Sequence, residues 1–194
     1  DAFSTIVDAV RQGRIIFNNI RKFLTYLLSC NVSQITAVAV ASVARLPLPV
    51  RPLQILFLNV VTDVFPAMAL GVGPGDPRAM DRPPREPDEP VLTRRHWYGI
   101  GGYGILLSLA VLGTLLIALY GMGMEDERAV TCSFMTLAFV QLWHVFNMRD
   151  VDAPVLRNEV TRNGWVWGAL ALCVALILAA LYAPPLPSVL ELDP

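Results

Sequence analysis

Hydrophobic residues gather into five long windows, separated by shorter segments in which charged residues and prolines concentrate. The windows cover residues 23–44, 53–73, 98–121, 130–148 and 163–183. A helix of about 20 predominantly apolar residues crosses the hydrocarbon core of a bilayer, and each window has about that length. The pattern therefore predicts an all-α fold, a polytopic transmembrane bundle of five helices.

The segment before the first window, residues 1–22, has apolar residues close to the spacing of one helix face. Because no proline interrupts the chain from residue 1 to residue 44, we predict one helix of about 40 residues, roughly 60 Å long. Its first part would be a stalk that leaves the membrane on the cytoplasmic side. The alternative is an amphipathic helix that lies on the membrane interface.

The composition changes the picture by excluding an ordinary soluble domain, since 55% of the residues are hydrophobic and the mean hydropathy is +0.53. Most of the 15 Lys and Arg residues lie before the first window or in the loops that follow the second and fourth windows. The remaining loops contain only Arg45, Arg51 and Arg128. Basic residues concentrate on the cytoplasmic side of membrane proteins. The N-terminus and the loop at 74–97 are therefore expected in the cytoplasm, and the tail at 184–194 outside.

The segments between the windows carry their own signals. Three prolines between residues 47 and 52 predict a tight turn, so the first two spans form an antiparallel pair. The loop at 74–97 is too rich in proline and charge for regular structure, and we expect it to dock against a soluble domain or to remain an exposed linker. The tail at 184–194 is expected to be extended. The third window has a small-residue surface suited to close helix contact, formed by Gly99, Gly101, Gly102, Gly104 and Gly113.

Asp63 is the only formally charged residue in the five windows. A carboxylate at the centre of a transmembrane helix costs about 2.5 to 3.5 kcal/mol on insertion scales, so its presence indicates a function. Asn59 and Thr62 share its helix face if the helix is regular. Pro66 has no N–H, which leaves the Thr62 carbonyl without its helical donor. These oxygens are of the type that binds a dehydrated cation. The alternative is a protonated Asp63 that bonds to a neighbouring helix as a packing residue.

Other spans contribute polar residues at a similar depth. Asn31 and Gln34 lie one turn apart in the first span, and they either hydrogen-bond across helices or add neutral oxygens to the Asp63 site. Gln141 in the fourth span is a further candidate ligand. His144 is a weaker candidate, because a lone intramembrane histidine is more often a hydrogen-bonded residue of the bundle.

Several motifs occur together and in order along the chain. They are DAFSTIV at residues 1–7, the pair Asn18-Asn19, NVVTD at 59–63, PAMALG at 66–71 and MDRPPR at 80–85. In this combination the chain resembles the C-terminal membrane half of type II P-type cation-transporting ATPases, in particular the calcium pumps of the sarcoplasmic and endoplasmic reticulum and their bacterial relatives.

The resemblance implies that the five windows are the fifth to ninth helices of a pump that couples ATP hydrolysis, through an aspartyl-phosphate, to export of Ca²⁺ from the cytoplasm. Asn59 and Asp63 then correspond to ligands of one cation site, and Thr62 and Asn31 to ligands of its neighbour. The implied partners are the bilayer, here a bacterial-type plasma membrane, and the remaining helices and cytoplasmic domains of the same pump. ATP and Mg²⁺ would bind to parts of the pump that are absent from this chain. We expect this chain to be a fragment and to be inactive alone.

This sequence departs from the reticulum pumps at two positions, because Gln34 and Gln141 stand where those pumps have glutamates. Losing two carboxylates removes most of the attraction for a second divalent ion, although the number of oxygens is unchanged. We therefore predict one high-affinity divalent site. The alternatives are a P-type pump for manganese or a monovalent cation, and a regulatory membrane module that transports nothing.

Overall fold

The computed structural model describes residues 2–75, 80–81, 89–150 and 153–193, and this part of the chain is helical with no strand. The elements are α1 (Ala2–Val43), α2 (Pro52–Leu58), η1 (Asn59–Val64), α3 (Phe65–Gly71), α4 (Arg94–Leu116), η3 (Ile117–Gly121), α5 (Asp126–His144), η4 (Val145–Met148), α6 (Gly164–Tyr182) and α7 (Leu186–Val189). Five helices, some built from two or three of these elements, are long and apolar enough to cross a membrane. The predicted fold class is confirmed.

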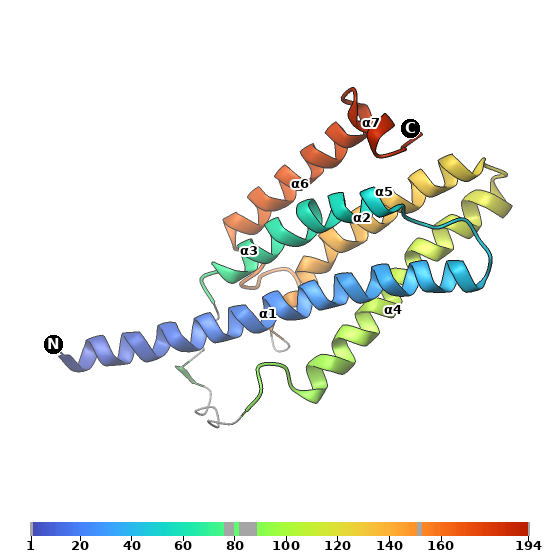
Figure 1. Ribbon diagram of the computed structural model, residues 1–194. Coiled ribbons are helices and arrows are strands. Elements are labelled where there is room, and N and C mark those ends of the chain that lie inside the picture. The colour runs from blue at the N-terminus through green and yellow to red at the C-terminus, as the bar shows by residue number, and fades with distance from the viewer. Residues whose placement is uncertain (1, 76–79, 82–88, 151–152, 194) are drawn as a thin grey trace.

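Helix α1 is unbroken over its 42 residues, Ala2–Val43, as the absence of proline predicted. Figure 1 shows its N-terminal part projecting beyond the other helices, which is the arrangement expected of a stalk. Its far end leads through the proline-containing turn to α2. The side of the membrane on which the stalk lies remains a prediction.

The second span is not one regular α-helix. It consists of α2, the π-helical turn η1 and α3. Pro66, near the start of α3, cannot donate to the carbonyl four residues earlier and its ring crowds that carbonyl. A wider turn just before the proline relieves this conflict, and such π-turns are frequent at functional sites. Asp63 lies inside the wider turn.

Among the described residues, three buried hydrophobic clusters hold the bundle together, and the smallest of them consists of Leu115, Ala118 and Ala129. One joins α2, α5 and α6 through residues that include Leu58, Phe134 and Ile177. Another includes Tyr26 of α1 and Ala67 of α3, and it lies toward the stalk. Along the second span, residues 62 and 63 lie between the part that joins the first cluster and the part that joins the second. Thr62 and Asp63 are therefore enclosed by packed apolar side chains.

The tail prediction was wrong, because residues 184–193 fold back over the bundle instead of extending away. They contain α7, and Leu190 and Leu192 are buried in the first cluster. The Gln54 amide donates to the Leu190 carbonyl at 2.9 Å, and the Asp193 N–H donates to Thr131 Oγ1 at 2.9 Å. Two apolar side chains and these backbone bonds stabilise a compact tail, which Figure 1 shows beside the end of α6.

The long loop also differs from its prediction where the structure describes it. Residues 94–97, expected in the loop, are the first turn of α4. The backbone N–H of the N-cap residue Thr93 donates to Nδ1 of His96 at 3.2 Å, as in a capping box. Just before this helix the chain docks against α1, where the Arg21 side chain donates to the Val91 carbonyl at 2.7 Å and pairs with Glu89 at 3.0 Å. Residues 76–79 and 82–88, with most of the MDRPPR motif, lie outside the described residues.

Of the five glycines predicted to form a small-residue surface on α4, only Gly104 makes a close contact with another helix. A Cβ built on Gly104 would lie 2.4 Å from Val32 Cγ1 of α1, closer than any real side chains approach. The other four glycines of the predicted surface have no atom within 4 Å of such a Cβ. Of these five glycines, Gly104 is therefore the one at which α1 and α4 approach most closely.

We expect Gly104→Ala to destabilise the protein by about 1 to 3 kcal/mol, the usual cost of overpacking. The added methyl meets a β-branched side chain that is rotationally stiff in a helix, so the helices must separate. The measurement is the thermal midpoint of the purified protein in detergent. Gly101→Ala is the matched control because its methyl meets nothing; equal midpoints for the two variants would contradict the prediction.

Candidate cation site

Asp63 lies inside the bundle and not at its lipid-facing surface, since only 3% of the residue is exposed. Its carboxyl oxygen Oδ1 is 3.5 Å from Thr62 Oγ1. The Cys30 side chain of α1 also lies beside the carboxyl group. The described residues contain no group of three or more His, Cys, Asp or Glu side chains that could hold a metal ion. A cation here would therefore depend on one carboxylate and on neutral oxygens.

The structure brings Gln141 of α5 next to Thr62 of η1. Thr62 Oγ1 lies 2.8 Å from Gln141 Oε1 and 2.9 Å from the Leu58 carbonyl oxygen. One hydroxyl proton serves only one of these acceptors at a time, while Gln141 Nε2 is buried without a hydrogen-bond partner.

If the side-chain amide of Gln141 is turned over, so that its nitrogen and oxygen exchange places, only one polar atom of this group is left without a partner. Gln141 Nε2 then donates to Thr62 Oγ1, and the Thr62 proton goes to Leu58 O. The atom left open is Gln141 Oε1, a buried amide oxygen of the kind that binds a hard cation. In this orientation Gln141 offers an open, buried oxygen next to Thr62.

The Thr62 carbonyl, which was predicted to be an open oxygen ligand, is engaged. It accepts a hydrogen bond of 2.7 Å from the hydroxyl of Tyr26, which is fully buried and also lies 3.2 Å from the Gln141 carbonyl oxygen. Pro66 does leave this carbonyl without its helical donor, but a side chain of α1 replaces that donor. The contact joins α1, η1 and α5.

Asn59, Asn31 and Gln34 are less closely associated with Asp63. The half-buried Asn59 has its Oδ1 atom buried without a partner, so this oxygen remains open to a ligand. Asn31 donates to the Leu27 carbonyl of its own helix at 2.9 Å. Gln34 is 4% exposed and its Nε2 has no partner. In the described part of the chain, no hydrogen bond joins Asn31 or Gln34 to the polar residues of η1.

His144 is buried among aromatic rings. Its ring lies 5.8 Å from that of Tyr26 and 4.7 Å from that of Tyr103, measured between centroids. Its Nδ1 is 3.2 Å from the Asn147 amide nitrogen, whereas Nε2 has no partner. These contacts are those of a packed bundle residue and not of a neighbour of Asp63.

Comparison with known proteins bears on this arrangement. The family model described as the C-terminus of cation-transporting ATPases matches residues 47–194. A calcium-transporting ATPase from Bacillus subtilis (strain 168) is 39% identical to this chain over 186 residues. The chain belongs to the P-type cation-transporting ATPases. The alignment covers 96% of the chain and 21% of the Bacillus ATPase, so the chain spans about a fifth of that relative's length.

Membership of the P-type ATPases confirms the resemblance read from the motifs, and with the five membrane-length helices it makes the chain part of a multi-pass membrane protein. Three side chains next to the candidate site were not singled out from the sequence. They are Cys30, which lies beside the Asp63 carboxyl, Tyr26, which bonds to the Thr62 carbonyl, and Cys173, whose Sγ lies 3.0 Å from the Val61 carbonyl oxygen. A buried tyrosine needs a partner for its hydroxyl, and this is the signal by which Tyr26 could have been found.

Proposed function

We propose that this region binds the transported cation of an ATP-driven pump and couples its binding to the phosphorylation cycle, with calcium exported from the cytoplasm. The observation that carries the proposal is the burial of Asp63 in a widened helical turn, beside Thr62 and within reach of α1 and α5. A buried, unpaired carboxylate is unfavourable unless an ion or a proton neutralises it. A transported cation supplies that charge while the pump is loaded.

The proposed ligands differ in how the structure supports them. Asp63 provides the charge, and Gln141, Thr62 and Asn59 provide neutral oxygens that are buried or unpartnered. Asn31 and Gln34 are the proposed remains of a neighbouring, weaker site. Calcium is proposed because the donors are all hard oxygens and because the Bacillus relative is a calcium-transporting ATPase. In the full-length protein, other regions would bind ATP and Mg²⁺ and carry the phosphorylated aspartate.

A pump for manganese or a monovalent cation is the second candidate. A single carboxylate among the proposed ligands favours the monovalent case, because lower site charge weakens the binding of a divalent ion more than that of a monovalent one. The two candidates share the same site and differ only in the ion.

We expect calcium to stimulate ATP hydrolysis by the full-length ATPase with a Hill slope of about 1, because only one carboxylate is available for a divalent ion. The measurement is ATPase activity against free calcium, manganese and sodium. A slope close to 2 for calcium would contradict the single-site prediction. Stimulation by manganese or sodium without stimulation by calcium would replace the first candidate with the second.

A further inference from the structure

The end of α3, the helix that follows Asp63, is capped by side chains of other helices. Asn19 of α1 donates through Nδ2 to the carbonyls of Gly73, at 2.8 Å, and Gly71, at 3.2 Å. Asn163, which precedes α6, donates to the Ala69 carbonyl at 2.9 Å. The last carbonyls of a helix have no partner within the helix. Here the Ala69 and Gly71 carbonyls accept from residues distant in the sequence, while the Met68 and Leu70 carbonyls accept from the backbone of residues 72 and 73. Asn19 is only 4% exposed.

The chain that leaves α3 also lies directly against α1. Gly75 has a φ of +73°, and a Cβ at this position would be 2.6 Å from Ile15 Cγ2. Only glycine allows both this backbone conformation and this close approach. The contacts of Ile15 and Asn19 are one helical turn apart on α1. The end of α3 and the residues after it therefore follow the surface of α1 over that turn.

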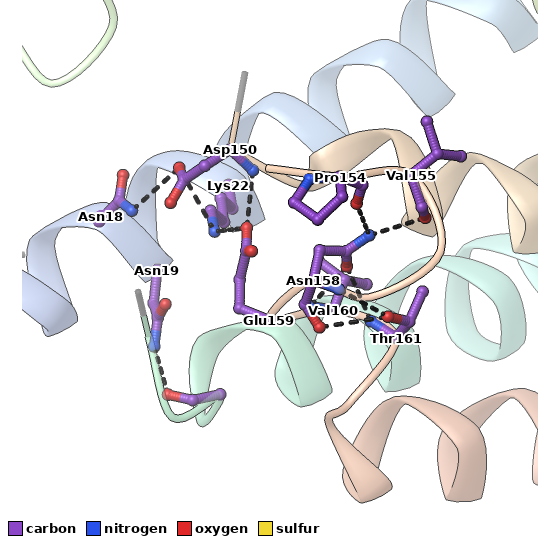
Figure 2. Close-up of polar contacts among 11 residues, drawn as sticks. Asn18, Asn19, Lys22, Asp150, Pro154, Val155, Asn158, Glu159, Val160 and Thr161 are labelled. Atoms are coloured by element: carbon purple, nitrogen blue, oxygen red, sulfur yellow. Dashed lines mark hydrogen bonds and ion pairs between the residues drawn. The ribbon is translucent and has the colours of Figure 1, made fainter. Parts of the chain in front are cut away.

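The α5–α6 loop is attached to the same part of α1. Lys22 Nζ lies 2.6 Å from Glu159 Oε1 and 3.6 Å from Asp150 Oδ1, and Asn18 Nδ2 lies 3.4 Å from that same Asp150 oxygen. Figure 2 shows these side chains pointing toward one another between α1 and the loop. The loop ends at Asn163. Asn19 of α1 and Asn163, the two residues that cap α3, therefore belong to segments that also bond to each other.

We propose that Asn19 is a positioning residue through which α1 holds the helix that carries Asp63, so that cation affinity depends on the amide donor at residue 19. This inference rests on the proposed function, since it takes Asp63 as a ligand. Asp63 and Gly71 are eight residues apart, about 12 Å along the span. Residues Phe65–Gly71 of this stretch form the regular helix α3, and residues 63 and 64 belong to the widened turn η1. Displacement of the capped end of α3 is therefore transmitted along α3 to the widened turn.

The test uses the full-length ATPase with Asn19→Asp and Asn19→Ala. Asn19→Asp keeps the volume of the side chain but replaces the donor with an acceptor that faces two carbonyls. In both variants we expect the apparent affinity for calcium to fall about fivefold to tenfold, the change expected for one or two lost hydrogen bonds. Calcium transported per ATP hydrolysed should also fall. The measurements are calcium-dependent phosphorylation and transport into vesicles, each normalised to folded pump.

Asn18→Ala is the matched control, because Asn18 is the adjacent residue of the same type and contacts the α5–α6 loop and not α3. It should keep the wild-type calcium affinity. The inference is overturned if both Asn19 variants keep wild-type affinity and transport ratio, including the case in which only the amount of folded pump falls. A wild-type pump that calcium does not stimulate would overturn the proposed function itself, and this inference with it.

Discussion

Asp63→Asn is expected to abolish calcium-dependent phosphorylation of the full-length ATPase at calcium concentrations that saturate the wild type. The substitution keeps the size of the side chain and one oxygen but removes the only charge among the proposed ligands. Calcium sites vary over several orders of magnitude in affinity with the number of charged ligands, so we expect a loss of at least about 100-fold. Phosphorylation by labelled ATP across a calcium titration measures it.

Asp126→Asn provides the control for this experiment. Asp126 is also an aspartate at the start of a membrane-length helix, but it lies outside the apolar window and is exposed in the first turn of α5. We expect it to keep the calcium dependence of the wild type. If Asp63→Asn gave the same titration as Asp126→Asn, Asp63 would be a neutral packing residue, which is the alternative that the sequence left open.

Lys22→Ala is expected to destabilise the protein by about 3 kcal/mol or more. The Lys22 side chain is 9% exposed, and the side chains of its partners Glu159 and Asp150 are each 10% exposed. Removing one member of a buried ion pair leaves its partner charged and desolvated, which typically costs about 3 to 5 kcal/mol. The thermal midpoint of the full-length ATPase in detergent measures the effect. Arg11→Ala, an exposed change on the same helix, should shift the midpoint little.

The dependence of stability on pH separates the ion pair from simple packing. Burial alone raises the pKa of Glu159, but the hydrogen bond and the charge of Lys22, together with backbone N–H groups, outweigh burial and lower it. A carboxyl with a lowered folded pKa stabilises the protein above its unfolded pKa, about 4.3, and loses that contribution as the pH falls through the folded value. Lys22→Ala should remove this acid-induced loss. An equal loss in wild type and variant would contradict an ion-pair role.

Much of the fold could be predicted because hydrophobicity and proline position act locally. The five spans and the unbroken α1 follow from these signals. The wider turn before Pro66 could not be predicted in the same way, because a proline within a span can be accommodated by a kink, a bulge or a new partner. The folded tail was missed because burial of Leu190 and Leu192 depends on a surface formed by α2, α5 and α6.

The candidate site was predictable in its residue types but not in its pairing. A charge within a span indicates Asp63 without any structure. The partner of its neighbour Thr62 is Gln141, which is 79 residues away, and the bond from Tyr26 spans 36 residues. Lys22 and Glu159, 137 residues apart, were assigned to a stalk and a loop with no signal that they meet. Sequence periodicity describes one helix face at a time, so contacts between helices remain outside its reach.

The place at which α1 is held has a mechanical consequence. Asn19 lies about 18 Å from Asn31 along α1, at 1.5 Å per residue. If α1 pivots at Asn19, a sideways movement of the stalk before this residue is reproduced in the opposite direction at Asn31, in proportion to the distance from the pivot. A lever of this kind would let a movement outside the membrane displace side chains at the depth of the proposed ion site.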